Sequence, residues 1–523
     1  MLFNRFLFQK ATAVAFFVFC AVCEAQTAKH FMVAAAHPLA VDAGYGVLKR
    51  GGTAVDAAIA VQMVLGLVEP ESSGIGGGAF LLYWSEKEKK LRSYDGRETA
   101  PAAAHRDLFF DSNREQLEFR EAVASGLSVG VPGVLRMLEL AHRRHGKLPW
   151  AGLFDPAIAL AERGFTASPR LRMLLERERF QFPQKNPEYA AALRAIAQGG
   201  ADAFYGGALT ADMVRAVRSH AKPGSITAQD FADYRALERE PLCAMHYAWR
   251  ICSMGPPSSG GVAVLQILGL LERTDFARAP PQSAAAVHYF AEAGRLAYAD
   301  RARYLGDPDF SPVPTRKLLS GRYLDERAKL IGERSMRLVS AGDTEAVGTS
   351  HVSIVDGEGN AVSMTTTIEA SFGSRIMVRG FLLNNQLTDF DFAPGGPNEA
   401  APRKRPRSSM APTMVFSGER LEMVVGSPGG PNIINYVAKA LVGRLDWKMD
   451  LQSAIALPNF GSRNGPTLIE KGSGYESLIK ELSQRGHEIE TPVLTSGLHG
   501  IERVPGGWRG AADPRREGTA RGD

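Results

Sequence analysis

The sequence predicts an α+β fold in which two β-sheets lie between layers of helices. Segments with the alternation of strands occur before residue 100, and a mostly helical pattern covers 130 to 330. After residue 349 the pattern changes to segments rich in Val, Ile and Thr, which are typical of strands. Helical patterns return at about residue 430. This order of elements is what we expect of two stacked sheets with helices outside them.

The elements before residue 100 have clear boundaries. A helix is predicted from 39 to 49, because Gly51-Gly52 is a stop signal. The segment 54–68 is rich in Ala, Val and Leu on nearly all sides, which predicts a buried helix. A strand is predicted from 80 to 84, and a strand followed by a loop from 91 to 98.

The remaining elements follow from the same periodicities and from capping residues. Predicted helices cover 134–144, 155–164, 209–220, a segment that starts at 226–230, 260–271, 284–304, 430–443, 450–456 and 474–485. Predicted strands cover 351–356, 361–368, 379–384, 412–416 and 421–426. The final tripeptide Arg521-Gly522-Asp523 is expected to lie in a disordered tail, where its likeness to an integrin motif is chance.

The composition is that of an ordinary globular protein. Of 523 residues, 45% are hydrophobic and 22% are charged, and the formal net charge is +5. This charge is small for the length, and no basic run is interleaved with aromatic residues. Nucleic acid is therefore not predicted as a partner.

The N-terminus has the features of a signal peptide over residues 1–25. Arg5 and Lys10 form a basic region before an apolar run from 11 to 22. This run is too short to span a bilayer, and Cys23-Glu24-Ala25 after it resembles a cleavage site. An uncleaved membrane anchor is the alternative. No other apolar run is long enough to cross a membrane, so the mature protein is predicted to be periplasmic or secreted, without a membrane span.

Four cysteines are present, and two of them fall in the predicted signal peptide. In an oxidising compartment the other two, Cys243 and Cys252, could form a disulfide. The interpretation that we favour from the sequence is two buried thiols in one strand. Neither cysteine is a candidate for catalysis.

Three short motifs suggest other chemistry but lack the required context. Gly74-x-Gly76-x-x-Ala79 fits a dinucleotide fingerprint, yet a helix precedes it and a strand follows it, the reverse of the required order. The run 126–130 fits the Gly-x-Ser-x-Gly elbow of serine hydrolases, but Val131-Pro132-Gly133 separates it from the next helix. His142 and His145 have no third metal ligand near them in the sequence, so no metal site is predicted.

A predicted hairpin is the strongest candidate for a site. The segments that begin at Thr349 and end near Thr367 flank the turn 356–360, so the two threonines should lie near the same end of a sheet. A threonine hydroxyl needs a base, which can be the α-amine of the same residue if that residue begins a chain. The polar, loop-like segment 340–348 and the absence of a Cβ at Gly348 would suit such a cut. The alternative is a threonine that only begins a strand.

Five ordered runs strengthen the catalytic interpretation. They are YDGRETAP (94–101), TSHVSIVD (349–356), LLNNQLTDF (382–390), RPRSSMAPT (405–413) and GSPGG (426–430). Together they resemble the γ-glutamyltranspeptidase family over about residues 32–515. The resemblance implies an αββα N-terminal-nucleophile hydrolase that cuts itself before Thr349. The precursor would give a large subunit, 26–348, and a small subunit, 349–523, which are partners of one another.

The resemblance also assigns roles to residues of this sequence. Thr349 would be the nucleophile and its freed amine the base, and Thr367 would hydrogen-bond the nucleophilic hydroxyl. Gly429 and Gly430 would donate backbone N–H groups to the oxyanion. Arg97, Ser408 and Ser409 would bind the substrate's α-carboxylate. Its α-ammonium would be held by Glu369, Gln386 and Asp389. No cofactor is predicted.

The expected activity is γ-glutamyl transfer and glutathione hydrolysis, with water, an amino acid or a peptide as acceptor. Two departures from the family pattern keep alternatives open. Many members have Asn at the position of Glu369, and many bacterial members have a longer segment, forming a lid, between the positions of Asp389 and Arg405. An open pocket would suit a cephalosporin or glutaryl acylase on the same fold. The third alternative is an unprocessed, non-enzymatic secreted protein.

Overall fold

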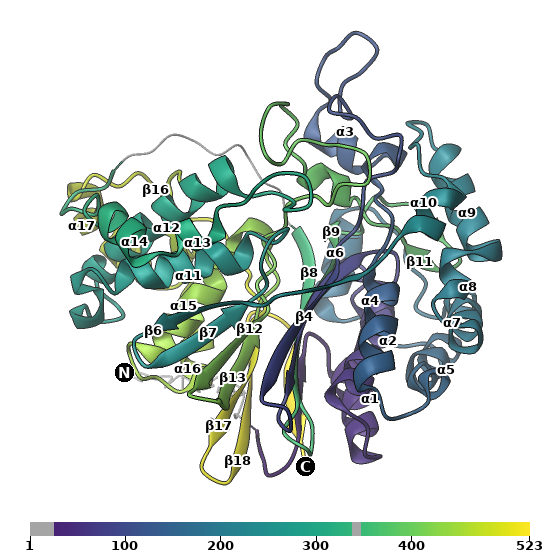
Figure 1. The fold of residues 1–523 in the computed structure, drawn as a ribbon, viewed down its shortest axis with the longest axis horizontal. Coiled ribbons are helices and arrows are strands. Elements are labelled where there is room, and N and C mark those ends of the chain that lie inside the picture. The colour runs from purple at the N-terminus through teal and green to yellow at the C-terminus, as the bar shows by residue number, and fades with distance from the viewer. Residues whose placement is uncertain (1–25, 337–346) are drawn as a thin grey trace, which may run out of the picture.

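The computed structural model describes residues 26–336 and 347–523, which form four layers (Figure 1). Two large β-sheets face each other in the middle, and helices cover the outer face of each sheet. The predicted αββα arrangement is therefore confirmed. The predicted signal peptide 1–25 and residues 340–346 of the predicted loop lie outside the described residues.

The first sheet carries the predicted threonine hairpin near its centre. Within the described residues its spatial order is β19 (Thr519–Gly522), β2 (Met32–Ala35), β8 (Val347–Val355), β9 (Ala361–Ala370), β3 (Gly78–Ser85), β4 (Lys90–Gly96) and β5 (Leu237–Arg239). Because β8 pairs with β2 on one side and β9 on the other, hydrogen bonds hold both edges of its backbone.

The second sheet is also antiparallel throughout. Its spatial order is β1 (Thr27–Ala28), β18 (Gly507–Ala512), β17 (His499–Val504), β13 (Arg420–Gly426), β12 (Thr413–Ser417), β7 (Trp249–Ser253) and β6 (Leu242–His246). Both sheets combine strands from before and after residue 349. Two chains produced by a cut there would remain joined by the hydrogen bonds of both sheets.

The helices form the two outer layers. The layer on the first sheet contains α1 (Pro38–Lys49), α2 (Ala54–Val68), α4 (Val134–His145), α5 (Asp155–Arg163), α6 (Pro169–Arg177), α7 (Pro187–Gly199), α8 (Asp202–Tyr205), α9 (Gly207–Arg218) and α10 (Ala228–Asp233). The layer on the second contains α11 (Gly260–Leu271), α12 (Ala284–Tyr304), α13 (Thr315–Leu318), α14 (Gly321–Ala328), α15 (Ile433–Leu445), α16 (Leu451–Ala456) and α17 (Ile479–Gln484). In the described part of the chain, no helix is both long and apolar enough to cross a bilayer.

Apolar side chains fill the space between the sheets and under each helical layer. Trp84 of β3 and Phe416 of β12 meet between the sheets, with ring centroids 4.8 Å apart. Helix α2 is buried along its whole length, as predicted, and Thr53 and Asp56 cap its N-terminus reciprocally. The predicted helices 54–68, 260–271 and 284–304 have the predicted boundaries.

Two predictions about secondary structure are wrong, and the region 130–330, which is mostly helical as predicted, also contains strands. The predicted strand 379–384 is divided into β10 (Met377–Val378) and β11 (Phe381–Leu382), because Arg379 and Gly380 both have positive φ and make a turn. The region 130–330 contains β5, β6 and β7 besides its helices. The C-terminal tripeptide is not in a disordered tail, since β19 pairs with β2. The small strands β14 (Phe460–Ser462), β15 (Thr467–Ile469) and β16 (Ile489–Glu490) form a separate sheet.

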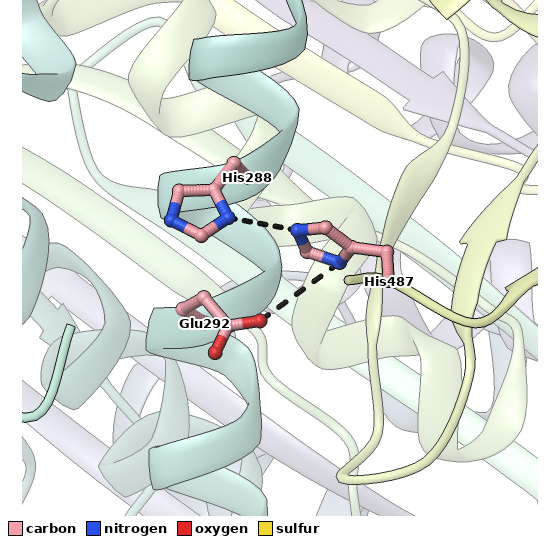
Figure 2. Close-up of side chains that lie close together, drawn as sticks. All are labelled: His288, Glu292 and His487. Carbon is pink, nitrogen blue, oxygen red and sulfur yellow. Dashed lines mark hydrogen bonds and ion pairs between the residues drawn. The ribbon is translucent and has the colours of Figure 1, made fainter. Parts of the chain in front are cut away.

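A buried polar network holds residues 332–336 against α12 (Figure 2). His288 Nε2 lies 2.7 Å from the carbonyl oxygen of Gly332, so Nε2 carries the proton and Nδ1 accepts from His487 Nε2, also at 2.7 Å. His487 Nδ1 in turn lies 2.7 Å from the hydroxyl of Thr467. Glu292 accepts from the backbone N–H of Met336 at 2.8 Å. Both imidazoles are neutral in this arrangement.

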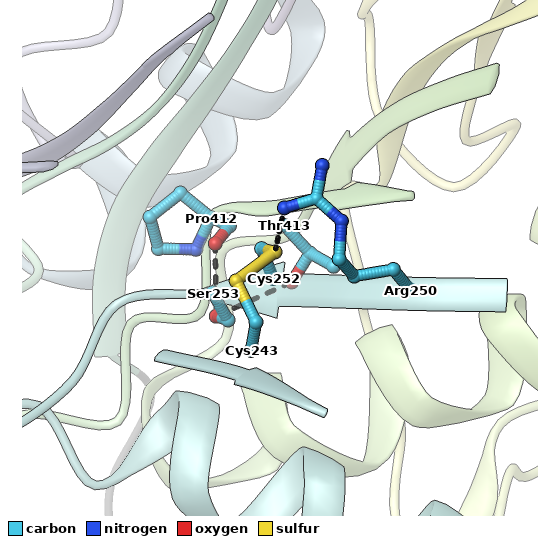
Figure 3. Close-up of a disulfide and its surroundings, with 6 residues drawn as sticks. All are labelled: Cys243, Arg250, Cys252, Ser253, Pro412 and Thr413. Carbon is cyan, nitrogen blue, oxygen red and sulfur yellow. Dashed lines mark hydrogen bonds between the residues drawn. A yellow bond between two sulfur atoms is a disulfide. The ribbon is translucent and has the colours of Figure 1, made fainter. Parts of the chain in front are cut away.

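The two cysteines outside the predicted signal peptide form a disulfide, so the favoured interpretation of two thiols in one strand is wrong (Figure 3). Cys243 lies on β6 and Cys252 on β7, at directly paired positions of an antiparallel hairpin. The sequence does not predict this hairpin because its turn, Tyr247-Ala248, has no Gly, Asn or Asp. Tyr247 nevertheless takes the left-handed conformation, with φ 50°. The disulfide closes the edge of the second sheet.

Acid is expected to destabilise the protein through its buried neutral histidines. Burial lowers the pKa of His487 and His499 to about 3, and that of His351 well below its usual value. The unfolded chain binds a proton at each position below a pKa of about 6.5. Stability from these groups is therefore complete above about pH 6.5 and is lost as the pH falls, by up to about 1.4 kcal/mol per pH unit for each histidine.

The thermal unfolding midpoint should accordingly be lower at pH 5 than at pH 7. His499 is the best position for a control variant, because neither ring nitrogen has a hydrogen-bond partner within the described residues. In His499→Gln the difference between the two pH values should shrink. An equal difference in the variant and the unaltered protein would contradict this account of His499.

Loss of the disulfide should reduce stability. Opening the short loop from Cys243 to Cys252 restores chain entropy to the unfolded state, worth about 2–3 kcal/mol in the loop-entropy model. We expect this loss in the Cys243→Ser, Cys252→Ser variant, measured by urea unfolding, and a similar loss for the unaltered protein in reductant. Alkylation of Cys243 or Cys252 in denatured, unreduced protein would show that the bond is absent.

Candidate active site

The β8–β9 hairpin brings the two predicted catalytic threonines together. Thr349 lies directly opposite Thr367, and both side chains are buried. The hydroxyl of Thr349 donates to Thr367 Oγ1 at 3.3 Å. The strand register is irregular between Gly348 and Thr349, so the pairing changes at the peptide bond where cleavage is predicted.

The Thr367 hydroxyl is at the centre of a set of hydrogen bonds around that peptide. It donates to the carbonyl oxygen of Gly348 at 2.7 Å and accepts from the backbone N–H of Glu369 at 2.8 Å. A Cβ at Gly348 would lie 2.1 Å from the carbonyl oxygen of Glu71, so the backbone approaches more closely there than any other residue would allow.

One hollow of about 300 Å³ collects almost all of the predicted site residues. Its lining includes Arg97, Thr349, Thr367, Glu369, Gln386, Asp389, Ser408, Ser409 and Gly430. These residues come from five separate parts of the sequence, which the two sheets and the segment after β11 bring to one place. The remaining predicted residue, Gly429, borders a neighbouring hollow.

One end of the hollow is built around Arg97, which follows β4 and is almost fully buried. Its guanidinium donates to the carbonyl oxygens of Pro406 at 3.0 Å and Arg407 at 3.1 Å, which fixes its plane. Ser409 accepts a hydrogen bond from Arg301 of α12 at 3.0 Å. The Arg97 guanidinium and the hydroxyl-bearing residues Ser408 and Ser409 line this end, and the Arg301 guanidinium, which makes no ion pair with a carboxylate within the described residues, contacts it through Ser409. Such a group of donors suits a carboxylate.

The other end of the hollow offers acceptors. Asp389 ends the short 3₁₀ helix η4 (Gln386–Asp389), and its Oδ2 accepts from Arg97 at 2.5 Å and from Gln386 Nε2 at 2.8 Å. Gln386 Oε1 is buried and has no hydrogen-bond partner in the described structure. An unpaired buried acceptor beside a carboxylate suits an ammonium group.

Glu369 adds a second carboxyl group at this end. Its backbone takes the left-handed conformation with φ 80°, and its Oε2 accepts from Asn385 Nδ2 at 2.6 Å. Burial, and then the charge of Asp389, raise the pKa of Glu369 to about 8. The group is therefore mostly protonated at neutral pH in the empty hollow. A bound cation would favour its ionised form.

The loop before α15 supplies backbone donors. Gly429 has φ 133° and Gly430, which begins the 3₁₀ helix η5 (Gly430–Asn432), has φ 52°. A Cβ at Gly429 would lie 2.5 Å from the ring of Tyr436, so this position requires glycine. Neither glycine's N–H donates a hydrogen bond within the described structure. Element η5 contacts β8, so two free donors lie near the strand of Thr349.

A buried ionic network behind Thr349 was not anticipated. Ser350 donates to Glu69 Oε2 at 2.8 Å, and Arg170 forms an ion pair with Glu71. Arg516 donates to the carbonyl oxygen of Thr349 at 3.4 Å. Burial, and then the charge of Glu71, raise the pKa of Glu69 to about 7. The only signal in the sequence is a pair of acidic residues directly after a helix that is mostly apolar.

The potential metal ligands of the described chain do not form part of this site. Only His288, Glu292 and His487 bring three ligand atoms within 4.8 Å of one another in the described residues, and none of them lines the hollow. Their polar atoms take part in the network of Figure 2, and Arg295 donates to Glu292 at 2.8 Å. His142 and His145 point to different partners, the carbonyl oxygen of Leu148 and the hydroxyl of Tyr94.

Comparisons with known proteins agree with the fold. The sequence model of the family described as Gamma-glutamyltranspeptidase matches residues 40–522. A glutathione hydrolase proenzyme of Bacillus subtilis is 36% identical, over 94% of this chain and 92% of that protein. The acylase ACY 1 proenzyme of a Pseudomonas strain is 35% identical, over 94% of this chain and 93% of that protein.

A solved structure has the same fold. The cephalosporin acylase from Bacillus halodurans superposes on this structure with a TM-score of 0.85 and 25% sequence identity. The match covers 100% of this chain and 99% of that chain. Glutathione hydrolases and acylases are thus both among its relatives.

Proposed function

The chain belongs to the γ-glutamyltranspeptidase family, and on that premise we propose that it is a self-processing γ-glutamyltransferase and glutathione hydrolase. Cleavage between Gly348 and Thr349 gives subunits 26–348 and 349–523. Thr349 then carries the γ-glutamyl group to water, an amino acid or a peptide. Export after loss of residues 1–25 places this activity in the periplasm or outside the cell.

One observation supports the proposal: the hollow that contains Thr349 has hydrogen-bond donors suited to a carboxylate at one end and acceptors suited to an ammonium group at the other. In the empty site Arg97 and Asp389 neutralise each other. A zwitterionic α-amino acid group can replace that pair, with its carboxylate on Arg97, Ser408 and Ser409 and its ammonium on Asp389, Gln386 and Glu369. Because the two ends bear opposite charge, the amino acid enters in one orientation, with its side-chain carbonyl toward Thr349.

Processing follows from the bonds around Gly348. The hydroxyl of Thr349 attacks the Gly348 carbonyl carbon, and negative charge develops on an oxygen that already accepts from Thr367 at 2.7 Å. The C–N bond breaks and an ester forms while the amide nitrogen takes up a proton. Water then hydrolyses the ester, which leaves a carboxylate on Gly348 and a free amine on Thr349.

Turnover uses the same hydroxyl with its new neighbour, the α-amine. An α-amine has a pKa of about 7.7–8.0, which suits a general base near neutral pH. The amine takes the proton from Oγ1 as the oxygen attacks the γ-carbonyl, and the N–H groups of Gly429 and Gly430 receive the oxyanion. The leaving amine takes the proton and departs, and water or an amine then releases the γ-glutamyl group.

An acylase that removes glutaryl or cephalosporin side chains is the second candidate. The short segment between Asp389 and Arg405 favours it, because none of residues 390–404 lines the hollow and no lid covers Thr349 from that side. The similarity to the Pseudomonas acylase also supports it. A glutaryl group lacks the amine, so it would leave Gln386 Oε1 and Asp389 without their proposed partner.

Processing gives the most direct test. Active enzyme should run as two bands on a denaturing gel, and N-terminal sequencing of the shorter chain should begin Thr-Ser-His-Val. Thr349→Ala should remain one chain and lose at least about 10³-fold in turnover of a γ-glutamyl chromogenic amide. Thr349→Ser is the matched control, because it keeps both a hydroxyl and an α-amine and should still cleave. A single intact chain with full activity would contradict the proposal, and an intact, inactive chain would favour a non-enzymatic protein.

The pH dependence of kcat/KM should report the ionisation of Glu369. For a γ-glutamyl amide, kcat/KM requires both the Thr349 amine and Glu369 in their deprotonated forms. The pKa of Glu369 is about 8, so below pH 7.5 the rate should rise by more than tenfold per pH unit. Glu369→Gln keeps an acceptor for Asn385 and should reduce the slope to at most tenfold per unit.

A glutaryl amide serves as the control substrate, because it has no ammonium for Glu369 to bind. Its rate should show the shallower slope with or without the substitution. A higher kcat/KM for the glutaryl amide than for the γ-glutamyl amide would favour the acylase over the transferase.

A further inference from the structure

The strand that begins at Thr349 has a neighbouring strand on only one edge at its start. Residues 349–351 pair with β9, whereas the pairing with β2 begins at Val352. The first three residues of the proposed small subunit therefore lack one of the two ladders that hold the rest of β8. Because a chain end held by few hydrogen bonds is mobile, another contact is needed to keep a nucleophile there in place.

Side chains hold these residues where β2 does not. Ser350 directly follows the nucleophile, so its side chain points to the opposite face of the sheet. There its hydroxyl donates to Glu69 Oε2 at 2.8 Å and accepts from the hydroxyl of Ser73 at 3.4 Å. Arg516 donates to the carbonyl oxygen of Thr349 at 3.4 Å. Ser350 and Glu69 are both buried, so water does not compete for the bond between them.

Glu69 is itself held firmly. It is the C-cap residue of α2, and its backbone N–H donates to the carbonyl oxygen of Leu65 at 2.8 Å. Its own carbonyl oxygen accepts from the N–H of Ser72 at 2.9 Å, and the Ser72 carbonyl oxygen accepts from Ile368 of β9 at 3.2 Å. The turn that carries Glu69 is thus bonded both to a buried helix and to the strand of Thr367.

The bond from Ser350 does not require the charge of the Glu69 carboxyl group. Burial, and then the charge of Glu71, raise the pKa of Glu69 to about 7, so both of its forms are present at neutral pH. Either form keeps an oxygen that can accept from Ser350. Arg170 Nη1 lies 3.9 Å from Glu69 Oε1 and is already paired with Glu71. A neutral amide at position 69 can therefore replace the carboxyl group as an acceptor.

Building on the proposed function, we propose that Glu69 is a positioning residue for the nucleophile: through Ser350 it anchors the chain end that the cut creates, and so keeps the hydroxyl and the α-amine of Thr349 aligned. Before the cut, the strand continues into residues 347 and 348, which also pair with β9. The cut removes that tether, so the anchor matters more for turnover than for processing. In the described structure neither Glu69 nor Ser350 lines the hollow of Thr349, so the anchor affects the chemical step and not substrate binding.

The test removes the contact from either side. In processed protein, Glu69→Ala and Ser350→Ala should each lower kcat/KM for γ-glutamyl-p-nitroanilide at least about tenfold, because a misplaced nucleophile reacts slowly. The inhibition constant of L-glutamate, which has the same α-amino acid group and no amide to cleave, should stay within about twofold. The double variant should be no slower than the slower single variant, because both changes remove one contact. Glu69→Gln keeps an acceptor and should stay within about threefold of the unaltered kcat/KM.

The matched control is Glu139→Ala. Glu139 of α4 is a buried glutamate in the same helical layer, it accepts from the backbone N–H of Ala201 at 3.0 Å, and it is not among the described residues that line the hollow of Thr349. This variant should have a lower thermal unfolding midpoint but an unchanged kcat/KM per processed chain. The comparison separates positioning of the nucleophile from a general loss of stability.

An unchanged kcat/KM in Ser350→Ala, the smallest of these changes, would overturn the positioning proposal even if Glu69→Ala does not fold. Losses that multiply in the double variant, or a loss in Glu69→Gln as large as in Glu69→Ala, would also overturn it. These results would leave the proposed function intact, because the unaltered protein would still be cut and active. If the unaltered protein turned over only a glutaryl amide, the proposed substrate would be wrong and the same variants would be compared with that donor. An uncut protein that turns over neither donor would overturn both proposals.

Discussion

The structure depends on the pairing of Thr349 with Thr367 in the middle of an antiparallel sheet. A chain end is normally mobile, and a nucleophile on a chain end would lose its alignment. Here the first residues of β8, Thr349 among them, pair with β9, and residues 352–355 pair with β2 as well, so the strand that follows the proposed cut is held in register. The hydroxyl of Thr367 needs this register, because it contacts Thr349, Gly348 and the backbone of Glu369 at once.

The same register separates two electrostatic environments. On one side lies the hollow with Arg97 and Asp389, where opposite charges neutralise each other in the empty state. On the other side lie Arg170 and Arg516, with Glu69 and Glu71 buried beside them. A buried charge is costly unless an opposite charge lies beside it, and each environment contains such an ion pair, Arg97 with Asp389 and Arg170 with Glu71. Gln386 Oε1, one of the buried atoms without a hydrogen-bond partner in the described structure, belongs to a residue that lines the hollow where the proposed ammonium group would sit.

Much of this arrangement could be predicted from the sequence, because the hairpin that carries Thr349 and Thr367 is determined by neighbouring residues. The alternating segments around 349–367 and the turn between them define the hairpin, and nine of the ten predicted catalytic and substrate-binding residues line one hollow. The contacts that the sequence did not reveal join distant segments, as Arg516 joins Thr349 and Arg301 joins Ser409. The Cys243–Cys252 hairpin was missed for another reason: Tyr247 of its turn has a conformation that its residue type does not favour, and its backbone N–H donates to Glu272, which is distant in the sequence.

The proposed site offers a reason why a single fold can serve both transferases and acylases. In the proposed mechanism the reacting groups, Thr349 and the Gly429 and Gly430 donors, do not depend on what the acyl group carries. Discrimination comes from the ammonium end, where an acyl group without an amine leaves a buried acceptor unpaired, at a cost of about 1–3 kcal/mol. Asp389 is 34% exposed, so water can relieve part of its loss, whereas Gln386 Oε1 is enclosed. The buried amide of Gln386 therefore discriminates more strongly than the carboxylate beside it.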